Sequence, residues 1–455
     1  MGEGITSGTG SNGPLVTLIS HSVRFRAMIL QMSEDNSQSN GPLAGLNVLE
    51  VGDWGEVAGK LLGDAGAEVI RVEVPKLGSA SRSHGPFVGD EPGVNRSLAF
   101  AARNTSKRSV TLNLDSTRGQ QIFSDLASRA DIVIDSAGPE VLNNRNCGHD
   151  KLLQENPKLI WCSITAFGLT GPRKDWPWND LVSMALGGPM MSTGYDDHDL
   201  PPIRPDGLHS MNISNEYAIT AVLAALWLGT SSEDSVGHLL DVSAHECISA
   251  TTEGSFPNWA YLGQLVQRQT GRHASVQRVP AWQHLTTDDQ YVLLMGGGVP
   301  RDSKVFANLL NWMDEHDASG DMHDPIYQEV LFKDPRLDPG ARNRIVETIT
   351  DFVKSLTAEE VYRGGQGIHM PWGTVRSPED NLSDPHWDER EFWWESELPE
   401  YDGKVRFPGA PYRFSASKVK MSRRPPLLGE HNSEVYSELG FSKNDLVQLA
   451  RDDII

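Results

Sequence analysis

Several ingredients are scarce in this 455-residue chain. It has three cysteines, Cys147, Cys162 and Cys247, and their odd number and wide spacing argue against a disulfide framework or a zinc site. We therefore expect no metal site and a reducing, cytoplasmic location. The longest apolar run, Ala218–Leu228, is about half of the roughly 20 residues that a membrane span needs, so we expect no membrane partner.

Positive charge is also scarce, because 40 basic residues face 61 acidic ones and the net charge is -21. That charge disfavours nucleic acid and anionic membranes, and a phosphate-bearing ligand needs a local basic patch. Residues 1–40 are rich in Gly, Ser and Asn and lack the charge order of a signal peptide. We expect them to be a disordered extension.

The dinucleotide fingerprint is missing from a place that otherwise suits it. The sequence predicts a buried strand at Asn47–Val51, a helix at Val57–Gly66 and a second strand at Glu68–Val72. The turn between the first two has no G-x-G-x-x-G spacing, and Asp53 and Glu56 would repel a pyrophosphate on the helix end. The unit is therefore Rossmann-like without an ordinary NAD site, which places a nucleotide-dependent oxidoreductase last among the candidates.

Strands and helices alternate as far as Ile164, with helices expected at Thr117–Ala130 and Asp150–Asn156. This alternation predicts an α/β fold with a doubly wound parallel sheet. A long apolar helix follows at Ile213–Leu228, and beyond about Pro257 the patterns become shorter. The length of 455 residues also favours two domains or more.

Two short segments have more than one interpretation. Lys107 and Arg108 stand just before an alternating strand, where they form either a solvated edge or a phosphate clamp. The tryptophans of residues 390–403 suit packing or interface surface better than a stacking platform. The tail predicts two amphipathic helices, Asn432–Leu439 and another capped by Ser442.

Six motifs in order resemble those of the class III CoA-transferases, the carnitine and bile-acid type that includes formyl-CoA transferase. They are GLNVLE, LLGDAGAEVIRVE, NTSKRSVTLNL, ADIVIDSAGP, SITAFGLTGP and PPLLGEHNSEV. The resemblance implies a Rossmann-like large domain from residues 41–255 and 395–455, and a smaller α+β domain from residues 256–394. It also implies a homodimer whose subunits interlock as rings.

In that family, CoA passes from an acyl-CoA thioester to a carboxylic acid through a mixed anhydride on an enzyme carboxylate. Acyl-CoA and a carboxylic acid are then substrates, and no cofactor is bound permanently. A helix N-terminus suits the nucleophile, because it keeps the carboxylate ionised and offers free N–H groups to an oxyanion.

The chain departs from the family at the nucleophile, because the aligned position before the long helix is Met211. A thioether cannot form an anhydride. Asp206, five residues upstream, and Asp180, where some members carry a second carboxylate, are the remaining candidates. Asp180 also suits a helix cap, and Asp206 a turn before glycine. His209 is a candidate proton carrier or a polar loop residue.

The resemblance places CoA against the first turn, the end of the second strand and the following basic strand. The basic residue that the family has after the second strand's glutamate is Val74 here, which shifts phosphate binding towards the remaining cations. The implied CoA-binding residues are Asp53, Trp54, Arg71, Val74, Lys107, Arg108, Leu112, Ser136, Ala137 and Arg145.

Two alternatives stay open within this fold. One is an acyl-CoA racemase or isomerase that uses Asp180 and a histidine, although the family's histidine aligns near Asp150 and His149 is only adjacent. The other is a non-catalytic CoA-binding subunit that works with a homologous partner. Numerous tryptophans and methionines around the loop before the long helix suggest a bulky apolar acid as substrate.

Overall fold

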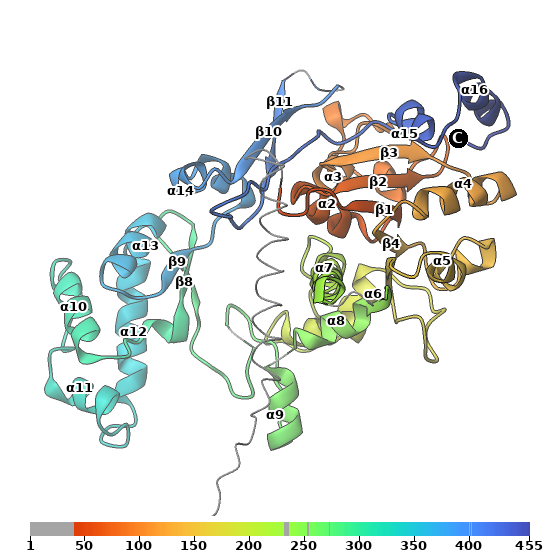
Figure 1. Ribbon diagram of the computed structural model, residues 1–455. Coiled ribbons are helices and arrows are strands. Elements are labelled where there is room, and N and C mark those ends of the chain that lie inside the picture. Colours follow the sequence, from red (N-terminus) through yellow and green to blue (C-terminus); the bar gives the residue numbers. More distant parts are fainter. Residues whose placement is uncertain (1–40, 232–235, 253, 273, 400, 402) are drawn as a thin grey trace, which may run out of the picture.

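The computed structural model describes residues 41–231, 236–252, 254–272, 274–399, 401 and 403–455. The extension predicted for residues 1–40 lies outside these described residues. Figure 1 shows two parts, a sheet with helices on both sides and a smaller group of helices beside it. We call residues 41–250 together with 432–455 the sheet lobe, and residues 283–374 the helical lobe.

The sheet lobe is built on six parallel strands in the order β3-β2-β1-β4-β5-β6. This confirms the predicted parallel α/β sheet, and it is the strand order of a Rossmann fold. The strands are β1 (Asn47–Gly52), β2 (Glu68–Glu73), β3 (Lys107–Thr111), β4 (Ile132–Ser136), β5 (Ile160–Thr165) and β6 (His238–Ser243).

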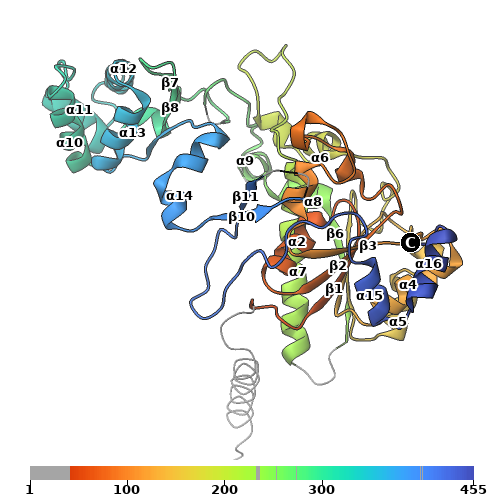
Figure 2. The same ribbon diagram turned by 90° about the horizontal axis from the view of Figure 1, so that it is seen from above.

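Helices cover both faces of this sheet, as the turned view in Figure 2 also shows. Successive side chains of a strand point to opposite faces. Val48 of β1 accordingly packs with α2 and α7, whereas Leu49 packs with α4 and α5. The helices of this lobe and the linker after it are α2 (Glu56–Asp64), α3 (Leu98–Arg103), α4 (Thr117–Ala127), α5 (His149–Glu155), α6 (Asp180–Leu186), α7 (His209–Ser231), α8 (Ala244–Ala250) and α9 (Ser255–Leu262).

Two of these helices begin elsewhere than the sequence predicted. α7 begins at His209, four residues before the expected Ile213, because its first turn is polar and only later turns are apolar. α6 is capped by Asn179, whose side chain accepts from the Val182 N–H, so Asp180 is its first residue and not its cap. Within the described residues, no helix has both the length and the hydropathy needed to span a bilayer.

The helical lobe has a core of its own, in which Phe306, Ile349 and Trp372 are buried. Its three strands form an antiparallel sheet in the order β7-β8-β9. A hairpin of β10 and β11 and the short helix α14 connect it with the tail. The bounds are β7 (Gln283–Leu285), β8 (Tyr291–Leu294), α10 (Ser303–Asp314), α11 (Pro325–Phe332), α12 (Ala341–Lys354), α13 (Ala358–Gly367), β9 (Trp372–Thr374), α14 (Pro385–Glu389), β10 (Trp393–Glu397) and β11 (Lys404–Pro408).

The end of the chain returns to the sheet lobe as α15 (Asn432–Glu438) and α16 (Lys443–Arg451). Tyr436 is fully buried, and its hydroxyl donates to the Thr111 carbonyl oxygen of β3 at 2.6 Å. Ser442 caps α16 in a capping box with Asp445, as the sequence predicted. The edge strand of the sheet is therefore covered by residues more than 300 positions away.

Replacing Tyr436 tests how far the sheet depends on this tail. Tyr436→Ala removes a buried ring, so we expect the free energy of unfolding to fall by about 3–5 kcal/mol. Tyr436→Phe loses the hydroxyl alone and should cost about 1–2 kcal/mol. Urea denaturation measures both, with Val447→Ala on the exposed face of α16 as the control. A Tyr436→Ala loss no larger than that of the control would contradict the tail's structural role.

Candidate active site

A pocket of about 360 Å³ opens at the carboxyl edge of the sheet, where β1, β2, β3 and β4 end side by side. Ligands of open α/β sheets bind outside the carboxyl ends of the strands, so this is the expected place. Half of the residues assigned to CoA by resemblance line it, namely Asp53, Val74, Leu112, Ala137 and Arg145.

The turn from β1 to α2 forms one wall of this pocket and is tightly fixed. Gly52 has a φ of +84°, and a Cβ there would lie 2.4 Å from the carbonyl carbon of Ser136. The Ser136 hydroxyl oxygen accepts from the Trp54 N–H at 3.0 Å and the Gly55 N–H at 2.9 Å. Ser136 therefore shapes the turn and occupies N–H groups ahead of α2.

Arg71 lies below the pocket and not in it. It is fully buried, and its guanidinium contacts the carboxylates of Glu50 and Glu56, the latter at 2.8 Å. Its Nε donates to the Ser79 hydroxyl at 3.0 Å. Arg71 therefore supports the turn through its ion pairs instead of presenting a free cation to a ligand.

Lys107 belongs to the same buried group. Its ammonium is 2.7 Å from Glu50, and it donates to the Glu56 carbonyl at 2.7 Å and to the Asn104 side chain at 2.8 Å. Burial lowers the pKa of Lys107 to about 8, against the opposing effect of Glu50. The structure does not bring this lysine to the pocket. The sequence left two interpretations open, a solvated edge and a phosphate clamp, and neither describes a residue with no exposed surface.

Arg108 and Arg145 differ in their access to the pocket. Arg108 is at the amino end of β3, away from the carboxyl edge, and it binds Glu434 at 3.0 Å and Glu438 at 2.7 Å on α15. Arg145 lines the pocket with one-third of its side chain exposed, and Asp115 binds it at 2.6 Å. Of these two arginines, Arg145 is therefore the one placed to contact a phosphate in the pocket.

Asp180 is buried at the first residue of α6, and it also faces the first turn of α7. One carboxylate oxygen accepts from the Ser210 N–H at 2.9 Å and from the Ser210 hydroxyl at 2.6 Å. The other is 3.1 Å from Arg204. Ser210 at the N-terminus of α7 and the guanidinium of Arg204 therefore fix the position of this side chain.

Asp206 and His209 occupy a different environment. The Asp206 side chain is fully exposed, and its nearest cation is Arg204 at 3.8 Å. His209 is the half-buried first residue of α7. Sequence reasoning missed Arg204, although an arginine two residues before a candidate carboxylate was a visible signal.

Met211 is buried in the first turn of α7, so its side chain is not presented to the surface. The second turn of α7 is tied to α2 and the turn before it, because the Asn215 side chain accepts from the Ala58 N–H at 2.8 Å and donates to the Trp54 carbonyl at 2.7 Å. The Asp180 region and the wall of the pocket are therefore fixed to each other.

An aromatic pair lies along this connection. The Trp54 ring is 4.2 Å from the Trp178 ring, and its indole N–H donates to the Ser214 hydroxyl at 3.3 Å. Trp178 stands two residues before Asp180, and Trp54 directly follows Asp53 of the pocket. The two rings thus join the segment that carries Asp53 to the segment that carries Asp180.

His149, the histidine of the racemase alternative, begins α5. Its ring contacts the Asn143 side chain at 3.0 Å and lies 6.1 Å from the ring of Trp161, which belongs to the core on the α4 and α5 face of the sheet. Asp180 instead contacts the first turn of α7, which covers the opposite face. These contacts give the racemase alternative no support.

A comparison with known protein families shows to which family the chain belongs. The model of CoA-transferase family III matches residues 43–432. The chain belongs to this family. The resemblance found in the sequence is confirmed, and the chain is accordingly a class III CoA-transferase by family.

Similar proteins act on several different acids. Succinyl-CoA:(R)-benzylsuccinate CoA-transferase subunit BbsE of Thauera aromatica is 28% identical over 88% of this chain and 94% of its own length. Human succinyl-CoA:glutarate CoA-transferase is 28% identical over 88% and 86%. Formyl-CoA:oxalate CoA-transferase of Streptomyces coelicolor is 27% identical over 91% and 99%.

Two solved structures share the fold. A CAIB/BAIF family protein from Brucella suis has a TM-score of 0.72 and 25% identity, over 88% of this chain and 100% of its own. Rv3272 from Mycobacterium tuberculosis has a TM-score of 0.67 and 23% identity, over 87% and 99%. The architecture of family III therefore extends across most of this chain.

Asp135, at the carboxyl end of β4 beside the pocket, should make stability depend on pH. Burial raises its pKa to about 6 from an ordinary 3.8, although the Ala137 N–H donates to it. Between these pH values the folded state binds more protons than the unfolded state, so the free energy of unfolding falls as pH rises. The loss reaches about 3 kcal/mol above pH 6.

Asp135→Asn removes this ionisation. We expect the variant to be more stable than the parent by about 1–3 kcal/mol at pH 7.5 and about equal to it at pH 4. Denaturant unfolding at both pH values measures the difference, with the exposed Glu155→Gln as control. A variant that is less stable than the parent at pH 7.5 would show that the ionised carboxylate is stabilised in the fold.

Proposed function

We propose that this chain transfers CoA from an acyl-CoA thioester to a carboxylic acid, with Asp180 as the covalent nucleophile. The observation that carries the proposal is the position of Asp180, whose carboxylate is held at the N-terminus of α7 by Ser210 and by Arg204 of the preceding loop. Asp206, the other candidate, has no comparable fixation. Because its side chain is exposed, Asp206 would have to give up its hydration and its rotamer freedom before it could react.

The proposed reaction divides one acyl exchange into simpler steps. An Asp180 oxygen attacks the thioester carbonyl carbon, the C–S bond breaks, and CoA leaves as the thiolate. The acceptor carboxylate then replaces the first acid on the enzyme. The thiolate attacks the acyl carbon of the acceptor, the bond to Asp180 breaks, and the carboxylate is restored. His209, at the start of α7, remains a proposed proton carrier beside this site.

The aromatic pair suggests the class of acid. Trp54 and Trp178 present ring surface between the pocket and Asp180, which favours an acid with a large apolar body over a small dicarboxylate. A relative that acts on (R)-benzylsuccinate, an aromatic acid, agrees with this choice. The acceptor or donor acid is therefore proposed to be aromatic or similarly bulky.

A second candidate function is a subunit that binds CoA while a homologous partner supplies the nucleophile. Two observations favour it. Met211, which the resemblance aligns with the family's aspartate, is buried and carries no carboxylate. The relative from Thauera aromatica is named as a subunit.

Trapping the intermediate separates these two functions. Incubated with acyl-CoA and then hydroxylamine or borohydride, the parent should yield a modified Asp180 in peptide mass spectra. Asp180→Asn should lower kcat by about 10³-fold or more while CoA still binds. Asp206→Asn, which removes the neighbouring exposed carboxylate, is the matched control and should retain activity.

Full activity in Asp180→Asn would end the assignment of the nucleophile. If the parent binds CoA but forms no adduct with any acyl-CoA, the partner-subunit function is supported instead. An adduct on Asp206 would identify Asp206 as the nucleophile instead.

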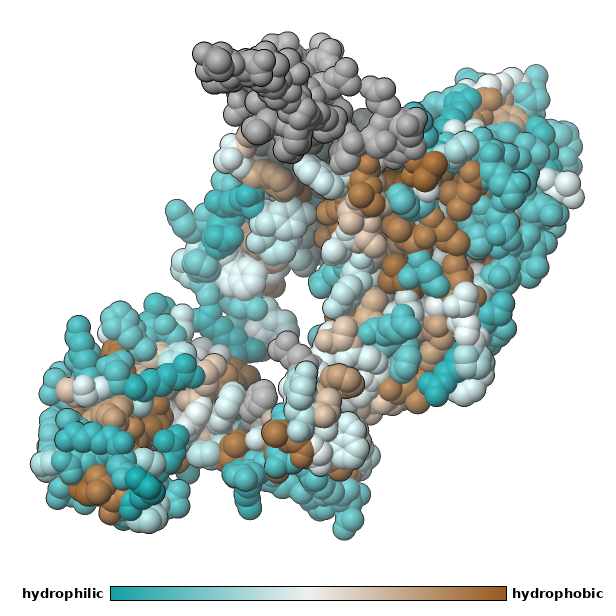
Figure 3. Space-filling view, turned by 60° about the horizontal axis from the view of Figure 1, so that its bottom comes forward, coloured by the Kyte–Doolittle hydropathy of each residue, from teal (hydrophilic) through white to brown (hydrophobic). Residues whose placement is uncertain are grey.

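We also propose that two copies of the chain interlock. Figure 3 shows an opening between the two lobes, of the kind through which a second chain can pass. α7 is apolar on nearly every face, yet Leu223, Trp227 and Leu228 are exposed in the single chain. A helix that is hydrophobic all round is normally covered on all sides.

Interlocked subunits cannot separate without unfolding. Tagged and untagged protein, expressed apart and mixed, should therefore form no mixed dimers under native conditions and should form them after joint unfolding and refolding. Light scattering should give twice the mass of the 50.0 kDa chain. Rapid exchange of native subunits would contradict the interlocked arrangement, and a monomer would exclude it.

A further inference from the structure

We propose that Lys76 binds a phosphate group of CoA, and that Asp453 near the end of the chain competes with that phosphate for Lys76. The inference rests on the proposed function, since it takes the pocket at the carboxyl edge of the sheet as the CoA site. It adds a ligand residue, Lys76, and a competing acid, Asp453, that the resemblance did not supply.

Lys76 stands on the rim of the pocket. Val74 and Gly78, on either side of it, both line the pocket, and the Gly78 N–H donates to the Val74 carbonyl at 2.8 Å to close the loop. The Lys76 side chain is 75% exposed, and its ammonium is 2.5 Å from the Asp453 carboxylate. An exposed lysine on a short closed loop can reach a ligand without a change of fold.

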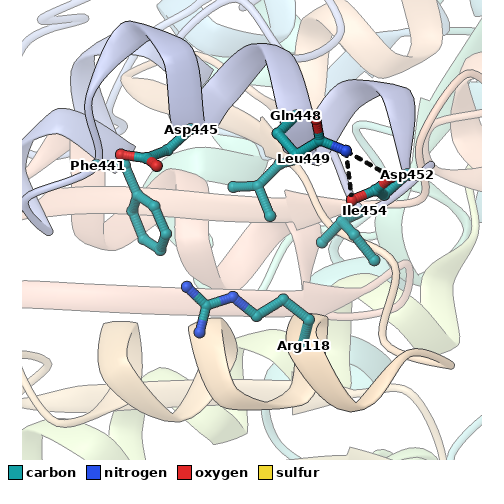
Figure 4. Close-up of a pocket in the computed structure, with 7 residues that line it drawn as sticks. All are labelled: Arg118, Phe441, Asp445, Gln448, Leu449, Asp452 and Ile454. Carbon is teal, nitrogen blue, oxygen red and sulfur yellow. Dashed lines mark hydrogen bonds between the residues drawn. The ribbon is translucent and has the colours of Figure 1, made fainter.

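Asp453 is fixed beside the same pocket by the last turn of the chain. Asn113, which lines the pocket, donates its backbone N–H to the Ile454 carbonyl at 2.7 Å and its side-chain N–H to the Asp453 carbonyl at 3.2 Å. Figure 4 shows Ile454 and Leu449 pointing from the tail towards α4, with Gln448 bound to Asp452. The acid is therefore held at the rim by buried neighbours on its own segment.

The other cations of the proposed site explain why Lys76 is needed. Arg71 and Lys107 are fully buried in ion pairs, and Arg108 binds α15. Val74, two positions before Lys76, stands where the resemblance implies a basic residue. With a net charge of -21, the chain needs a local cation wherever it binds an anionic ligand.

A phosphate can also displace Asp453 from Lys76 at little cost in free energy. An ion pair between two exposed side chains adds little stability, whereas a phosphate offers several charged oxygens to an ammonium. Arg145 is held by Asp115 on the same pocket in a similar way. Both rim cations are thus neutralised by carboxylates, which a phosphate would replace.

Titration calorimetry at low salt tests this exchange, with CoA, dephospho-CoA and 4′-phosphopantetheine as the probes. We expect Lys76→Ala to raise the Kd for CoA about tenfold and Lys76→Arg to restore most of the affinity. Asp453→Asn should lower the Kd about threefold, because it removes the competing charge. Asn also tolerates the left-handed backbone at this position, where φ is +54°. Lys333→Ala, in an exposed ion pair on α11, is the matched control.

The three probes identify which phosphate is bound. A loss confined to CoA assigns Lys76 to the 3′-phosphate, a loss shared with dephospho-CoA alone assigns it to the pyrophosphate, and a loss shared with all three assigns it to the phosphate nearest the pantetheine. Equal affinities of the parent and Lys76→Ala for every probe would overturn the proposal while leaving the pocket intact. Weaker CoA binding by Asp453→Asn would overturn the competition. A parent that binds no CoA would remove both this proposal and the proposed function.

Discussion

The structure of the site depends on how one buried arginine is neutralised. Arg71 lies below the pocket with no exposed surface, and a buried charge is tolerated only when it is paired and hydrogen-bonded. Glu50 and Glu56 supply that pairing from β1 and α2, and Lys107 of β3 joins the same network through its own ion pair with Glu50. Gly59 leaves room for it, since a Cβ there would lie 1.6 Å from the Glu50 carboxylate. This network fixes the turn that forms the pocket wall.

Sequence patterns predicted the order of the elements well, because buried parallel strands and capped helices leave local signals. The strand Asn47–Gly52 and the cap Ser442 are examples. The partners of charged residues could not be predicted in the same way. Lys107 pairs with Glu50, which is 57 positions away in the sequence, and Arg108 pairs with Glu438, which is 330 positions away. No local sequence pattern predicts partners at such separations. The earlier start of α7 has a similar cause, since its first turn is stabilised by contact with Asp180 and not by apolar periodicity.

Membership of CoA-transferase family III is shown, whereas the departure at Met211 is what the resemblance in the sequence implies. The fold of CoA-transferase family III extends over most of the chain, and the pocket occupies the place where such sheets bind ligands. The proposed nucleophile, Asp180, is not at the position that the resemblance aligns with the family's aspartate, because that position is Met211. Asp180 reaches the first turn of α7 from a neighbouring helix, so the same helix N-terminus meets a carboxylate that comes from elsewhere in the sequence.

The proposed transfer requires a thioester in the carboxyl-edge pocket to extend past Trp54 to Asp180. A crystal structure with a non-reactive acyl-CoA analogue measures this directly, through the distance from the analogue's carbonyl carbon to the nearest carboxylate oxygen. We expect an Asp180 oxygen within about 3.5 Å of that carbon, the range of a near-attack geometry. A bound analogue whose carbonyl carbon lies far from every Asp and Glu oxygen of either subunit would contradict it.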